Sequence, residues 1–174
     1  MAFEVALKSR LVEAMILCLL NDETVAEYWG DRIWHMEPDI EDEFSNAPCI
    51  YLWNDPPRDR LNPKIGDFAT PIFSVPVVLV EPTNKDPIPV GTGAIDSTSR
   101  REHVEKVLYA GDEEGDGEYN GKLFDPYDPT KFVNNIRPVF VQLTSKPWPL
   151  KGVTFYPIVA TYGSNTTRTG RQKI

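Results

Sequence analysis

The sequence has few of the residues that carry out catalysis or bind metal ions. Its 174 residues include only two cysteines, Cys18 and Cys49, and two histidines, His35 and His103. The cysteines lack the spacing of a metal site or a disulfide framework, so we expect buried, reduced thiols in a protein made in the cytoplasm. Neither histidine lies in an HExxH motif, no nucleophile-elbow sequence is present, and His103 is expected at the surface of a helix. We therefore expect a protein that is not an enzyme and that uses no metal ion or cofactor.

Long apolar runs and positive charge are also scarce. The longest apolar run, AMILCLL, has seven residues, whereas a membrane span needs about 18 or more, and the first ten residues lack the order of a signal peptide. The 26 acidic and 18 basic side chains give a formal net charge of −8. Such a surface repels phosphate, so we expect neither a membrane partner nor sequence-specific binding of nucleic acid. An acidic wall past which DNA slides is compatible with this charge, because an attractive wall would hold the DNA.

Proline, in contrast, is abundant and spread without a repeat. The chain has 16 prolines among 174 residues, or about 9%, against a usual share of ~5%. They occur in segments such as NDPPRDR, VEPTNKDPIP and SKPWPL. This pattern predicts short strands joined by long, stiffened loops, which are commonly functional or become ordered against a partner.

Apolar residues at helical spacing predict a first main helix near the start of the chain. Residues 1–20 carry the apolar stripe Phe3, Leu7, Leu11, Met15 and Cys18, at spacings of four and three. The second half of this segment is apolar nearly all round, which indicates burial on more than one side. Either the core of the chain itself or a neighbouring subunit could cover the second side.

Two further helices are marked by their ends. A short one is expected after a cap at Asn21 or Asp22 and ends at Gly30. The second main helix is expected over residues 97–111, with Ser99 and Glu102 as a capping box.

The expected strands complete an α+β layout. Strands are predicted over residues 31–36, 47–53, 71–81, 135–143 and 152–163. The strand over 71–81 contains Pro76, which cannot donate to a β-ladder, so we expect it at an edge of the sheet or bulged. The layout is a mostly antiparallel sheet packed against two main helices, with long proline-rich loops. We expect one domain over 1–163, followed by a polar, basic tail over 164–174 that is disordered on its own.

The segment DEEGDGEYNGKL, residues 112–123, could be a calcium loop or a solvated acidic loop. Aligned with an EF-hand, Asp112, Glu114 and Asp116 fill the first three ligand positions and Gly117 the turn. The twelfth position, which needs a bidentate glutamate, is Leu123. Two prolines in the following FDPYDP also stand where the exiting helix should begin. An acidic loop without metal is therefore the favoured interpretation.

The start of the chain resembles a known family. Residues 6–55, ALKSRLVEAMILCLLNDETVAEYWGDRIWHMEPDIEDEFSNAPCIYLWND, resemble the start of the tail terminator proteins of tailed bacteriophages, also called tail completion or minor tail proteins. Members have a long apolar helix, a short segment like VAEYWGDRIW, and a strand after a proline, as in APCIYLW. A further strand, a late helix such as RREHVEKVLY and C-terminal strands follow. The long central section and the acidic loop depart from this pattern, which leaves the particular neck component open.

The resemblance implies a structural virion protein, assembled in the host cytoplasm. Such proteins form a six-membered ring that caps the tail tube, ends its polymerisation and joins the tail to the head connector. The implied partners are other copies of the chain, the tail-tube protein and connector or neck proteins, with DNA only in passage. Two alternatives remain: another neck protein, such as a head-closure or adaptor subunit, and a calcium- or ligand-binding module that uses the acidic loop.

In such a ring, two sets of residues are candidates for function. The apolar first helix and the edge-like strand would contact a neighbouring subunit, through Phe3, Leu7, Leu11, Met15, Val75 and Val77. The acidic loop would face the central channel, through Asp112, Glu113, Glu114, Asp116 and Glu118.

Overall fold

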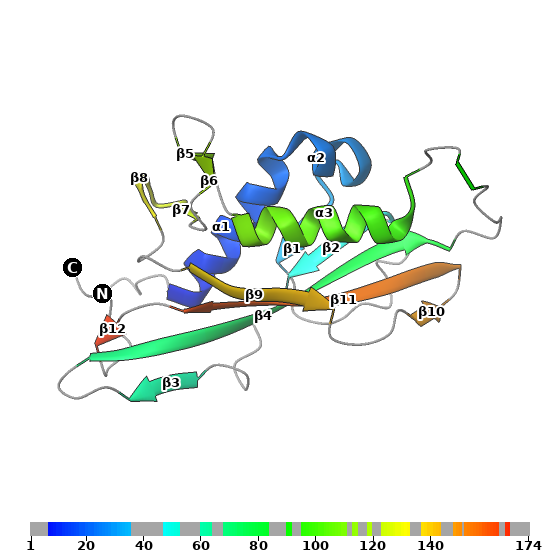
Figure 1. Ribbon diagram of the computed structural model, residues 1–174. Coiled ribbons are helices and arrows are strands. Elements are labelled where there is room, and N and C mark those ends of the chain that lie inside the picture. Colours follow the sequence, from blue (N-terminus) through cyan, green and yellow to red (C-terminus); the bar gives the residue numbers. More distant parts are fainter. Residues whose placement is uncertain are drawn as a thin grey trace.

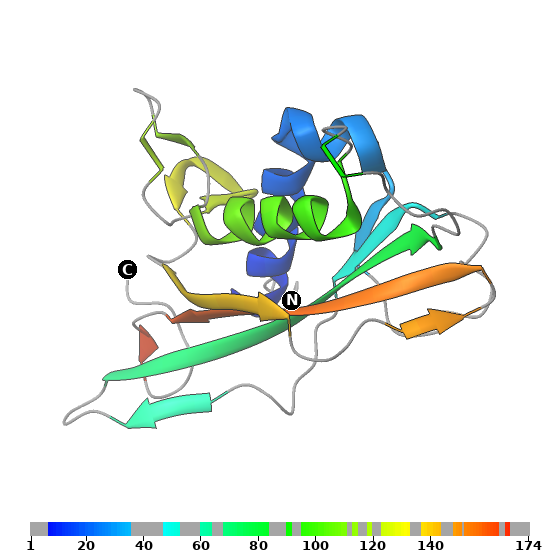
Figure 2. The same ribbon diagram turned by 45° about the vertical axis from the view of Figure 1, so that its right-hand side comes forward.

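Three helices lie on one face of a long, twisted sheet in the computed structural model (Figures 1 and 2). This arrangement confirms the expected α+β class. The structure describes residues 7–35, 47–52, 60–63, 68–83, 90–91, 95–110, 113–114, 118–119, 123–132, 137–143, 148–150, 152–163 and 166–167. The helices are α1 (Leu7–Asn21), α2 (Glu23–Trp29) and α3 (Ser97–Ala110). Within these ranges no helix has the length and apolar character needed to cross a membrane.

The main sheet has eight strands. They are β1 (Ile33–His35), β2 (Cys49–Leu52), β3 (Arg60–Pro63), β4 (Phe68–Pro82), β9 (Arg137–Leu143), β10 (Trp148–Leu150), β11 (Val153–Gly163) and β12 (Thr166–Thr167). Two small hairpins lie apart from it. One joins β5 (Glu113–Glu114) to β6 (Glu118–Tyr119), and the other joins β7 (Phe124–Asp125) to β8 (Asp128–Phe132).

The two longest strands, β4 and β11, form the centre of the sheet. They pair antiparallel in one register from Pro82↔Val153 to Ile72↔Gly163. Strands β2 and β3 pair with the other side of β4, and β9 and β10 pair with the other side of β11. Strand β1 lies beyond β2 and runs parallel to it, whereas the other pairs are antiparallel. The expected strand over 71–81 is therefore one segment of a 15-residue interior strand.

The prediction that the strand with Pro76 lies at an edge of the sheet or is bulged there is wrong, because β4 has neighbours on both sides and pairs with β11 without a register shift. Pro76 lies between the residues that pair with β3, which end at Ile72, and those that pair with β2, which begin at Val77. Pro157 occupies the equivalent place in β11, between the parts that pair with β10 and β9. Pairs in an antiparallel ladder alternate between hydrogen-bonded and non-hydrogen-bonded, so pairs two residues apart are of the same class. The pairs Pro76↔Val159 and Val78↔Pro157 are two residues apart. The β4–β11 ladder loses no hydrogen bond to proline only if both pairs are of the class that is not hydrogen-bonded. Each proline nitrogen then points away from the ladder, to the side where no strand pairs and no N–H is required.

The sheet is apolar on both faces, which explains the nearly continuous apolar sequence of β4. Alternate residues Val75, Val77 and Leu79 pack with the helices in the main core. Between them, Val78 and Val80 point to the opposite face, where they form a second buried cluster with Cys49, Tyr51, Val153 and Phe155. Both cysteines, Cys18 and Cys49, are buried and not disulfide-bonded, as the sequence predicted.

The structure corrects the predicted subunit-interface residues. Leu11, Met15, Val75 and Val77 are fully buried in the core of the chain itself, because the apolar stripe of α1 packs on the helix-facing side of β4. They leave no surface for a neighbouring subunit. Leu7 begins α1 but its side chain is not among those described, and Phe3 lies outside the described residues. Among the side chains of α1 that the structure describes, Leu17 is the large apolar one that is exposed.

The helix ends follow the sequence in one case and differ in another. Helix α2 has Asp22 as its N-cap, whose Oδ1 accepts the Val25 N–H at 2.9 Å, and Gly30 as its C-cap with φ 63°. For α3 the predicted capping box is wrong. The helix begins at Ser97, and Asp96 is the cap, because its Oδ1 accepts the Ser99 backbone N–H at 2.7 Å. The acidic side chain of Asp96 thus replaces the hydroxyl of Ser99 in this role.

The acidic segment and the tail both contain strand structure. Glu113 and Glu114 pair with Tyr119 and Glu118 in the β5–β6 hairpin, and a second hairpin, not an EF-hand exit helix, follows. In the predicted tail, β12 continues the line of β11 and pairs with Phe68 and Ala69 of β4. The start of the tail is therefore part of the sheet, whereas residues 164–165 and 168–174 lie outside the described residues.

Candidate functional site

Among the side chains that the structure describes, Glu81 is the charged one that is buried, at 1% exposure. It lies near the end of β4 and has the same strand phase as Val77 and Leu79, so it points to the helix-covered face. A carboxylate taken out of water is unfavourable unless a charged partner and hydrogen bonds compensate. Glu81 must therefore have a charged partner and hydrogen bonds in its surroundings.

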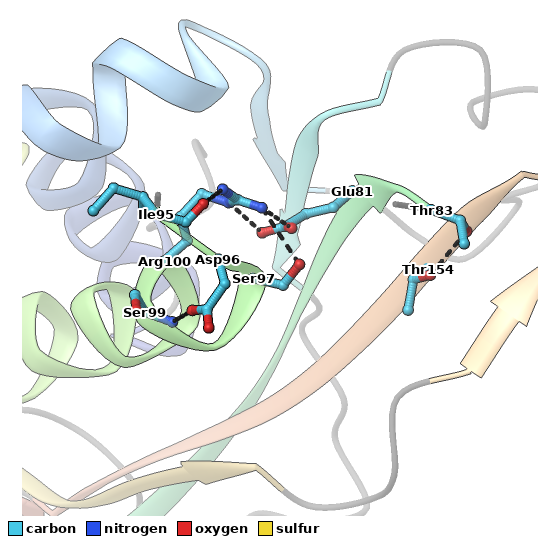
Figure 3. A network of polar contacts seen from close by, with 8 residues as sticks. All are labelled: Glu81, Thr83, Ile95, Asp96, Ser97, Ser99, Arg100 and Thr154. Atoms are coloured by element: carbon cyan, nitrogen blue, oxygen red, sulfur yellow. Dashed lines mark hydrogen bonds and ion pairs between the residues drawn. The ribbon is translucent and has the colours of Figure 1, made fainter. Parts of the chain in front are cut away.

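Arg100, in the first turn of α3, is the partner of Glu81 (Figure 3). Its Nε donates to Oε1 at 3.1 Å and its Nη2 to Oε2 at 2.7 Å, which makes the pair bidentate. Its remaining donors reach the Ile95 carbonyl at 2.8 Å and the Ser97 hydroxyl at 3.3 Å. The guanidinium also lies 4.2 Å from the ring centre of Tyr28 in α2, within cation–π range. Arg100 thus connects the sheet, α2 and the entry to α3.

The hydrogen bonds to Glu81 favour the charged form of Arg100. The hydrogen bond to Glu81 is the largest cause that raises the pKa of Arg100, and burial opposes it. Burial, followed by the Glu81 carboxylate, raises the pKa of the Tyr28 hydroxyl above its ordinary value. Since the donors of Arg100 are already used within the chain, we expect it to position structure and not to bind a substrate anion.

The same network fixes both ends of the segment between β4 and α3 (Figure 3). At its start, the Thr83 N–H donates to the Gly152 carbonyl at 2.9 Å, and the hydroxyls of Thr83 and Thr154 lie 2.9 Å apart. At its end, Arg100 holds the Ile95 carbonyl and Asp96 caps α3. Thr83 and Ile95 are therefore both held by hydrogen bonds to neighbouring elements.

A second polar contact ties α2 to α3. His103 Nε2 lies 2.8 Å from Asp22 Oδ1, the same oxygen that caps α2. His103 is thus partly exposed, with 30% of its side chain accessible, and the contact with Asp22 is a role that the prediction of a surface residue did not include. His35, at the end of β1, is exposed.

We expect the Asp96 cap of α3 to make the free energy of unfolding depend on pH in the acidic range. The Ser99 backbone N–H is the largest cause that lowers the pKa of Asp96 below its ordinary 3.8. A carboxyl with a lowered folded-state pKa contributes stability above its unfolded-state pKa, and that contribution is lost as the pH falls through the folded-state value. The advantage of the wild type over Asp96→Asn should therefore shrink as the pH falls below about 3.8. Urea unfolding of both proteins between about pH 5 and pH 2 measures this difference; a difference that does not change with pH would contradict the expectation.

The predicted channel residues form no ligand cluster in the described part of the chain. Glu113, Glu114 and Glu118 lie on the β5–β6 hairpin with side chains that are not described, and Asp112 and Asp116 lie outside the described residues. Across the described ranges, no group of His, Cys, Asp and Glu could hold a metal ion. Whether the hairpin faces a channel stays a prediction.

Sequence reasoning missed Glu81 and Arg100. The available signal was Glu81 itself, an acid in phase with Val77 and Leu79 at the end of an apolar strand. Its partner could not be found in this way, because 18 residues separate the two in the chain. The pair joins β4 to α3. No protein-family model and no curated protein sequence matches the chain.

Proposed function

We propose that the chain is a tail terminator of a tailed bacteriophage. In this role it forms a ring on the end of the tail tube, ends tube polymerisation, and joins the tail to the head connector while DNA passes through the centre. The proposal rests on the resemblance of residues 6–55 to that family. It assigns no catalytic residue, cofactor or metal ion to the chain.

The observation that carries the proposal is the order of the elements. The resemblance implies a long apolar helix, a short segment, a strand after a proline, a further strand, a late helix and C-terminal strands. The chain has α1, α2, then β2 after Pro48, the long β4, α3, and finally β9 and β11. The segment with the resemblance, from α1 to β2, is also packed together, since α1 contacts α2 and β1, and β1 pairs with β2.

The shape of the sheet is suited to contacts between subunits. In both views, the first half of β4, with β3 and β12, extends beyond α3 (Figures 1 and 2). A 15-residue strand spans about 50 Å at ~3.3 Å per residue, far more than one helix layer covers. An extension of this kind offers backbone and side chains to a neighbour without disturbing the core.

The charge is suited to a channel through which DNA slides. A ring of six copies would carry 6 × (−8) = −48 formal charges, screened beyond about 8 Å at physiological salt. In this proposal the acidic segment that contains Glu113, Glu114 and Glu118 lines the channel. Its repulsion of phosphate keeps the DNA mobile.

The test is the native mass of the purified chain, alone and with the tail-tube protein encoded in the same genome. We expect a ring of about 118 kDa, six times the 19.7 kDa chain, that stops the growth of tubes when added to polymerising tube protein. A monomer that ignores tube protein would contradict the proposal. A ring that binds the connector but not the tube would indicate a head-closure or adaptor subunit instead.

A further inference from the structure

We draw no further inference here: the strongest candidate, the indole N–H of Trp29, is buried at the C-terminal end of α2 without a hydrogen-bond partner in the described part of the chain, but it lies in the helix-covered core and nothing described there shows what would bind it.

Discussion

Replacing Arg100 by leucine is expected to lower the free energy of unfolding by about 3 kcal/mol, near the low end of the range for breaking a buried ion pair. The reason is that Glu81, at 1% exposure, would lose both hydrogen bonds and its only described cation while it remains buried. The low end applies because the Arg100 side chain is itself 19% exposed. Urea unfolding of the purified variant at neutral pH measures the effect.

Two further variants show whether the cost comes from the unpaired carboxylate. The double variant Glu81→Leu/Arg100→Leu removes both charges and should recover much of the lost stability, because a hydrophobic pair of similar volume often replaces a buried ion pair without loss. Arg101→Leu is the matched control on the same helix. Its pair with Glu105 is longer, at 3.9 Å, and should contribute less than about 1 kcal/mol. Equal costs for Arg100→Leu and Arg101→Leu would refute the assignment of Arg100 as the lock between sheet and helix.

Replacing Met15 by alanine is expected to destabilise the isolated chain by about 2–5 kcal/mol, the usual cost of truncating a large buried side chain. Met15 is fully buried among residues of α1, α3 and the sheet. Leu17, two residues away, is 44% exposed, so Leu17→Ala should change the stability by less than about 0.5 kcal/mol. Thermal or urea unfolding of the two variants compares them on one helix.

This pair of variants also decides which face of α1 serves assembly. We expect Met15→Ala to weaken folding and Leu17→Ala to leave folding nearly unchanged, so that any loss of assembly in Leu17→Ala would lie in a contact between copies. The opposite pattern, with normal folding and lost assembly for Met15→Ala, would restore the original prediction that the apolar stripe of α1 faces a neighbour.

Much of the fold is encoded locally and could be predicted. The apolar spacing of Leu11, Met15 and Cys18 indicates α1, and the cap Asp22 with Gly30 bounds α2. These signals act within a few residues of one another. The apolar stripe alone could not say whether the chain or a neighbour covers it, because burial in a core and burial at an interface have the same physical origin.

The features that were missed depend on partners far along the chain. The effect of Pro76 depends on whether a strand stands opposite its nitrogen, which its own neighbours in sequence do not determine. Strand β12 has two residues, too few for a periodicity. The site shows the same limit, since Glu81 was recognisable as an acid in strand phase, whereas Arg100 is its partner only because α3 lies over β4 in the folded chain.

The described sheet has two places where a central strand lacks a neighbour on one side, at Pro76 in β4 and at Pro157 in β11. These two breaks in strand pairing affect how stiff the subunit is. They are staggered, because the first lies opposite residues 73–76 of β4 and the second opposite residues 78–79, the partners of Pro157 and Tyr156. At residues 73–76 of β4, where neither β2 nor β3 pairs, β9 still pairs with β11 on the other side. At residues 78–79 of β4, whose partners in β11 pair with neither β9 nor β10, β2 still pairs with β4. From Ile72 to Val80 the sheet is at least three strands wide, although the β9–β11 ladder shifts register between Thr161 and Tyr162, opposite Ser74 and Phe73. The sheet is therefore continuous past both breaks, and the bulge between Thr161 and Tyr162 is where we expect the strands to bend.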